Sequence, residues 1–181
     1  MKKFPWKRAA AWAGLPVLAG LAAFRQWGRA DSLTLLLCLA AVAFGYLAAW
    51  WDLREKRVPN RLTAAMAGLW VLILVPHLFL RTEATLPVLV QGLLGAALGG
   101  GVFLLVYLIS RRGLGGGDVK FMAAAGLYLG IAGVLPTMLC GSVLAALTGG
   151  ILILCKRMGR KDSIPLIPFL YVGMLLTIFF R

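Results

Sequence analysis

Residues 86–135 read LPVLVQGLLGAALGGGVFLLVYLISRRGLGGGDVKFMAAAGLYLGIAGVL, which is two long apolar runs separated by a short polar segment. An α-helix needs about 20 mostly apolar residues to cross a membrane, and the runs 86–109 and 119–135 fall within the usual range of lengths. Between them lie two arginines, a run of three glycines and an aspartate. Because a carboxylate close to the hydrocarbon region costs free energy, an acid at this place suggests a functional role.

The same alternation of apolar runs and short basic segments extends along the chain in both directions. The 181 residues are 61% hydrophobic, whereas a soluble domain is about 45–50% apolar. We therefore predict an all-α integral membrane protein, a polytopic helical bundle with about seven transmembrane helices. A turn at Gly133 and Pro136 should separate the fifth helix from the sixth. The expected helices cover residues 9–24, 33–51, 62–80, 86–109, 119–135, 136–155 and 164–180.

Positive charges lie mainly in every second segment between the apolar runs. If the N-terminus is cytoplasmic, the inner segments carry fifteen of the nineteen lysines and arginines. The positive-inside rule then predicts a cytoplasmic N-terminus and an external C-terminus. We assign the net charge of +13 to this topology and to contact with anionic membrane lipid, not to nucleic-acid binding. The inner segments are 1–8, 52–61, 110–120 and 156–163.

The first expected helix, residues 9–24, has two interpretations. It is short, contains Pro16 and follows the basic sequence MKKFPWKR, so it also resembles a secretory signal peptide. We favour an uncleaved helix, because no clear A-x-A cleavage site follows the apolar run. The chain then divides into an N-terminal basic segment with an extra helix, residues 1–32, and a membrane domain over residues 33–181.

Two of the six acidic residues, Asp52 and Asp118, are expected at the same depth on the cytoplasmic side. Asp52 directly follows the second apolar run and Asp118 directly precedes the fifth. Two close carboxylates tend to share a proton, so one can accept a proton from water while the other donates one to a scissile carbonyl oxygen. This chemistry needs neither a metal nor a cofactor, and the three cysteines and single histidine form no metal-binding motif.

The residues before Asp118 favour a catalytic interpretation. Gly115, Gly116 and Gly117 can adopt backbone angles that are closed to other residues, and they let an extended peptide approach the acid. The alternatives are that either aspartate is a simple interfacial acid and that Asp118 is a helix N-cap.

The segment after Asp52 reads LREKRVPNRL and gives a second local signal. Pro59 favours an extended residue before it and ends one element. Asn60 is the expected N-cap of the third helix. The basic residues of this loop are explained by topology alone.

With both regions in view, the chain resembles the type IV prepilin peptidases, the A24 family of GxGD aspartic proteases. Three features carry the resemblance, which covers residues 33–180 as a six-helix peptidase core and leaves the helix 9–24 as an addition. The features are Gly115-Gly116-Gly117-Asp118 with Lys120 for GxGDxK, Asp52 with Val58-Pro59-Asn60 for D-x5-[IV]-P-N, and IPLIPFLYVG at 164–173 for the Pro-rich start of the last helix.

The resemblance implies an aspartic-type endopeptidase of a prokaryotic inner membrane, with its active site at the cytoplasmic face and no metal or cofactor. The implied substrate is a prepilin or pseudopilin whose short basic leader is cleaved after a glycine. The chain resembles the short, peptidase-only members, so methylation of the new N-terminus is not expected. The implied catalytic residues are Asp52 and Asp118, and the implied substrate-binding or supporting residues are Gly115, Gly116, Gly117, Lys120, Pro59 and Asn60.

Two other classes of function stay open at this point. The chain also fits a non-catalytic membrane scaffold or a small transporter subunit. Against a transporter, no acid is expected at mid-membrane depth, where coupling ions usually bind. The sequence predicts neither an oligomeric state nor the identity of a cognate pilin.

Overall fold

A computed structural model describes residues 31–110, 114–156 and 164–180 of the chain. These residues form five α-helices and no strand, which confirms the expected all-helical fold. The expected helix 9–24 lies outside the described residues, so the division at residue 32 stays a prediction. The helices are α2 (Ser32–Glu55), α3 (Asn60–Leu80), α4 (Thr82–Ile109), α5 (Gly116–Leu154) and α6 (Ile167–Phe180).

The expected count of seven transmembrane helices is not confirmed. Helices α2, α3, α4 and α5 are long and apolar enough to cross a membrane, whereas α6 has only 14 residues. The two helices that we expected at 119–135 and 136–155 lie within α5, whose two parts join without a loop at a kink. A polytopic membrane protein is still indicated, because one apolar segment after another has spanning length.

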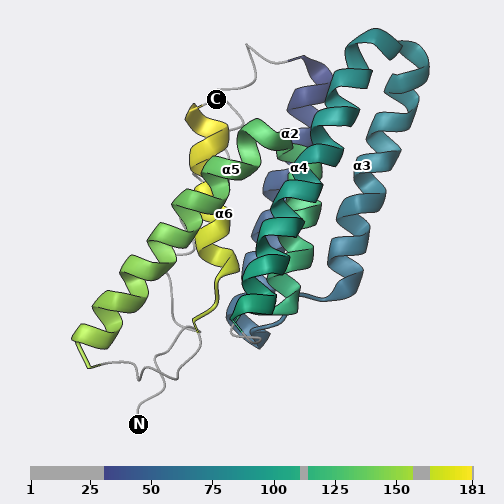
Figure 1. The fold of residues 1–181 in the computed structure, drawn as a ribbon. Coiled ribbons are helices and arrows are strands. Elements are labelled where there is room, and N and C mark those ends of the chain that lie inside the picture. Colours follow the sequence, from purple (N-terminus) through teal and green to yellow (C-terminus); the bar gives the residue numbers. More distant parts are fainter. Residues whose placement is uncertain (1–30, 111–113, 157–163, 181) are drawn as a thin grey trace.

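The break that we placed at Gly133 and Pro136 lies instead at Gly130. Gly130 has φ 63° and ψ −177°, a combination that is essentially restricted to glycine. Pro136 remains inside the helix, as membrane helices tolerate when neighbouring groups satisfy the freed carbonyl. In Figure 1, α5 changes direction sharply along its course, so its first part runs beside α4 and its second part runs beside α6.

Glycines let α4 and the first part of α5 approach closely. A Cβ atom on Gly95 would collide with the carbonyl oxygen of Gly126, and a Cβ on Gly126 would collide with that of Gly95. Gly99 follows Gly95 by four residues, and Gly130 follows Gly126 by four, so each helix presents a small-xxx-small face to the other. This contact fixes the first part of α5 against α4.

A second close contact joins the later part of α5 to α6. A Cβ on Gly173 would stand 2.6 Å from the carbonyl oxygen of Thr137, and a Cβ on Gly141 would stand 2.7 Å from Cα of Leu170. The hydroxyl groups of Thr137 and Thr177 also form a hydrogen bond of 3.1 Å. Helix α6 therefore sits firmly between α5 and α2, which it also contacts.

The end of α2 and the starts of α5 and α6 lie at the same end of the bundle, the lower end in Figure 1. Large apolar side chains cover much of the outer surface along the bundle, this end included, as suits helices surrounded by lipid. Strongly exposed examples are Leu72, Phe79, Leu108, Ile109, Leu139 and Leu154.

Candidate active site

Two buried aspartates meet at the lower end of the bundle. Asp52 lies in the last turn of α2 and is 5% exposed, and Asp118 lies in the first turn of α5 and is 9% exposed. The negative charge of Asp52 acts on Asp118, so the two carboxylates are close enough to interact. Aspartates are almost never this buried unless they are paired. The structure thus brings together the two acids that the sequence singled out.

Each carboxylate receives one hydrogen bond from the backbone. The N–H of Gly115 donates to Oδ2 of Asp118 at 3.1 Å, and the N–H of Ile167 donates to Oδ2 of Asp52 at 3.2 Å. Both of these bonds end on the Oδ2 atom of the carboxylate.

The start of α5 explains how Asp118 is held. Gly115 is the N-cap, and its carbonyl oxygen accepts the N–H of Asp118 at 3.0 Å. The carboxylate of Asp118 bonds back to the N–H of this same residue, so Asp118 acts from the third helical position and is not itself the N-cap. A negative side chain in the first turn is also favoured by the helix dipole.

The expected special backbone angles of the three glycines are not found, whereas the expectation that they let a peptide approach the acid stays a prediction. None of Gly115, Gly116 and Gly117 has a positive φ; among the glycines of the described segments, only Gly130 does. What they provide is space. A Cβ on Gly117 would stand 3.3 Å from Cβ of Val58, so this glycine lets the α2–α3 loop approach α5. A Cβ on Gly116 would have nothing within 4 Å.

Asn60 and Lys120 form a pair beside this loop. The expectation that Asn60 caps α3 is wrong, because Pro59 is the N-cap, with φ −63° and ψ 133°, and Asn60 is the first helical residue. Proline suits the N-cap of α3, because its locked φ is compatible with that position. Its carbonyl oxygen still accepts the first helical N–H, that of Leu62, at 3.0 Å. The side chain of Asn60 instead accepts a hydrogen bond from Nζ of Lys120 at 2.9 Å.

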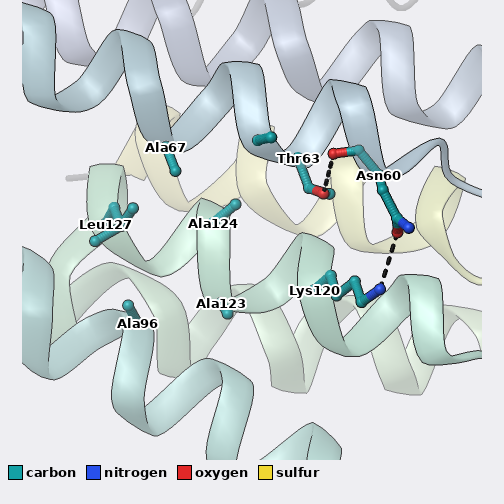
Figure 2. Close-up of a pocket in the computed structure, with 9 residues that line it drawn as sticks. Asn60, Thr63, Ala67, Ala96, Lys120, Ala123, Ala124 and Leu127 are labelled. Atoms are coloured by element: carbon teal, nitrogen blue, oxygen red, sulfur yellow. Dashed lines mark hydrogen bonds between the residues drawn. The ribbon is translucent and has the colours of Figure 1, made fainter.

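Figure 2 shows that this pair lies at one end of a groove between α3, α4 and α5. The groove has a volume of about 380 Å³ and is lined mostly by alanines. Helical residues two apart point about 200° away from each other, so Lys120 faces the groove while Asp118 lies on the opposite side of α5. The groove is therefore separate from the carboxylate pair. Its alanines are Ala64, Ala67, Ala96, Ala123 and Ala124.

Sequence reasoning missed the part played by Ile167. The segment 164–173 was noted only for its resemblance, yet its backbone reaches Asp52 across 115 residues of sequence. Pro165 and Pro168 mark the start of a helix, and the first N–H groups of any helix lack partners within it. The two prolines therefore indicated an unpaired N–H at the start of the last helix, but not that Asp52 would accept it. Within the described part of the chain, no group of three or more His, Cys, Asp or Glu could hold a metal ion.

Comparisons with known proteins identify the family of the chain. A model of the type IV leader peptidase family matches residues 37–150. A protein of Bacillus subtilis (strain 168) is 26% identical over 147 residues, which cover 81% of this chain and 56% of the relative. A protein of Xanthomonas campestris pv. campestris is 30% identical over 171 residues, which cover 82% of this chain and 56% of the relative. Both are named prepilin leader peptidase/N-methyltransferase. The chain thus spans about half the length of these curated relatives. No solved structure matches it.

Proposed function

Because the chain belongs to the type IV leader peptidase family, we propose that it is a membrane-embedded aspartic endopeptidase. Its substrates are prepilin-like or pseudopilin proteins, from which it removes the short basic leader. The observation that carries the proposal is the pair of buried carboxylates, Asp52 and Asp118, which act on one another from the ends of two different helices.

The proposed mechanism uses this pair as base and acid. The ionised carboxylate takes a proton from a water molecule, and the oxygen of that water attacks the scissile carbonyl carbon. The protonated carboxylate gives its proton to the carbonyl oxygen, which forms a neutral tetrahedral intermediate. The carboxyl group that took the proton from water then gives it to the leaving amine as the C–N bond breaks, while the other carboxylate takes a hydroxyl proton from the intermediate, which restores both groups. The backbone donors of Gly115 and Ile167 keep both carboxylates in place through these steps.

We place this chemistry at the cytoplasmic face of the membrane. Arg54, Lys56, Arg57 and Arg61 are exposed at the end of the bundle that holds the site, and the positive-inside rule assigns such an end to the cytoplasm. A substrate with a cytoplasmic basic leader and an apolar membrane helix has its junction at this same level. The bond to be cleaved would therefore meet the carboxylates without leaving the membrane surface.

The test is cleavage of an epitope-tagged prepilin coexpressed in bacterial membranes, scored by gel shift and mass. Asp52→Asn and Asp118→Asn should each lower the cleavage rate by about 10²- to 10⁴-fold, because each removes one proton-transfer group. Glu55→Gln is the matched control: it removes an exposed carboxylate from the same turn of α2 and should leave the rate within about twofold of wild type. Substantial activity in either aspartate variant would exclude that residue from the mechanism. A well-folded wild type that cleaves no prepilin would favour the scaffold instead.

A further inference from the structure

We infer that the backbone N–H of Ile167, at the start of α6, is a positioning group that holds Asp52 as the ionised member of the pair. Asp52 is then the base that activates water, and Asp118 is the acid. This inference rests on the proposed function and assigns a separate role to each carboxylate.

The contact is sheltered from water on both sides. The N–H of Ile167 donates to Oδ2 of Asp52 at 3.2 Å, Ile167 is fully buried, and Asp52 is 5% exposed. Solvent therefore cannot easily replace the donor, and its loss would leave a buried carboxylate oxygen without a partner. Hydrogen bonds to charged groups are also stronger than those between neutral groups.

The start of α6 presents this donor outward. The carbonyl oxygen of Leu166 accepts the N–H of Phe169 at 3.0 Å and that of Leu170 at 3.1 Å. Leu166 therefore stands at the N-cap position and Ile167 is the first helical residue. Its N–H has no acceptor within the helix, and the partial positive charge of a helix N-terminus is centred on such groups. Asp52 supplies the acceptor from another helix.

The prolines and the packing of α6 fix the direction of this donor. Pro168 has a locked φ and occupies the first turn, where its missing N–H costs no helical hydrogen bond. Pro165 and Pro168 are both buried. Further along, Gly173 holds α6 against α5. The donor therefore belongs to a rigid element and not to a loose loop.

The surroundings of the two acids favour Asp52 over Asp118 as the ionised member of the pair. Burial disfavours the ionised form of both carboxylates, and the repulsion between them acts on both. Each accepts one backbone N–H, from Ile167 or from Gly115, but Asp52 also feels the positive charge of Lys56. The described part of α6 carries no charged side chain, and Tyr171 is its only titratable group. One shared negative charge is therefore more stable on Asp52 than on Asp118.

The test removes the N–H and keeps the helix. Ile167→Pro deletes the donor at the first helical position, which accepts proline well. Ile167→Ala is the matched control, because it loses the same buried side chain but keeps the N–H. Both variants are purified with the wild type in detergent, and leader cleavage is measured against pH. Replacing Ile167 by its α-hydroxy acid analogue is a second probe, since the resulting ester lacks the N–H and retains the side chain.

Removing the donor should make the ionised base harder to form. In the proline and ester proteins we expect the acid limb of the pH profile to move up by about one pH unit relative to the alanine variant. At the midpoint of the wild-type limb this corresponds to about a fivefold loss of rate, and at more acid pH to about a tenfold loss. The alanine variant should keep the wild-type limb even if it is slower overall.

The possible failures can be told apart. If the folded proline protein or the ester protein has the same acid limb as the alanine variant, the positioning role is overturned, while wild-type cleavage and its loss in Asp52→Asn still support the peptidase. If the wild type cleaves nothing, the proposed function fails first. If the proline variant does not fold, the ester protein alone decides between the two outcomes.

Discussion

Gly115 and Gly116 offer a test in which neighbouring glycines should behave differently. An added methyl group on Gly115 would stand 3.0 Å from Oδ2 of Asp118 and 3.7 Å from its Cγ. The carboxylate must then move by a few tenths of an ångström. The same methyl group on Gly116 would meet nothing within 4 Å. Both glycines lie at the exposed start of α5, Gly115 as its N-cap and Gly116 as its first helical residue.

The size of the effect follows from the displacement. A misplacement of about 1 Å in an active site costs about 10²-fold in rate, so a shift of a few tenths of an ångström should cost about four- to tenfold. Stability should fall by only about 0.5–1 kcal/mol, which is the cost of placing alanine at the N-cap, because the crowded atom is the mobile end of a side chain. Gly115→Ala is therefore expected to impair cleavage without loss of fold, and Gly116→Ala should cleave like wild type.

The assay is prepilin cleavage by purified protein under single-turnover conditions, beside thermal unfolding of the same samples in detergent. Single-turnover rates report on the chemical step and not on product release. Equal rates in Gly115→Ala and Gly116→Ala would refute the idea that Asp118 must keep its present position. A large fall in the unfolding temperature of Gly115→Ala would show that the damage is structural.

Two further predictions concern the parts that support the site. Gly126→Ala should lower the unfolding free energy by about 1–3 kcal/mol, because its methyl group would collide with the backbone of Gly95. The control is Gly101→Ala, whose methyl group would have nothing within 4 Å. In thermal unfolding this control should be neutral or slightly stabilising. A double-mutant cycle of Asn60→Ala and Lys120→Ala, measured on the free energy of unfolding, should give a coupling of about 0.5 kcal/mol for their exposed hydrogen bond. Cleavage by these variants should stay within about threefold of wild type. A hundredfold loss in Lys120→Ala would assign that residue to the catalytic machinery.

The sequence was most informative where a single physical rule applies. Apolar runs of spanning length predicted the helices, and their charged ends predicted that Asp52 and Asp118 would lie at one end of the bundle. The structure places both acids there and buries them together. Neither the helices nor the common depth of the two acids had to be predicted from contacts between distant segments. The length of each helix, and the fact that successive helices cross the membrane in opposite directions, already set the depth of each residue in the membrane.

Predictions failed where two local rules competed. Pro136 was taken as the break in α5, but a proline can stay inside a membrane helix, and the turn formed at Gly130, where only glycine accommodates the angles. Asn60 has the better capping side chain, yet the preceding Pro59 took the N-cap. The bond from Ile167 to Asp52 could not be predicted at all, since it depends on how α6 packs against α2.

The bend at Gly130 has a mechanical consequence for the carboxylate pair. Asp118 lies twelve residues before Gly130, which is about 18 Å along a helix. On a lever of that length, each degree of change in the bend carries Asp118 sideways by about 0.3 Å. A catalytic group has to stay within about 0.5 Å of its working position, so the angle at Gly130 has a tolerance of only about two degrees. The close contact between Gly95 and Gly126 holds the first part of α5 on α4, so this contact, on the Asp118 side of the bend, keeps a change in the bend angle from displacing the active site.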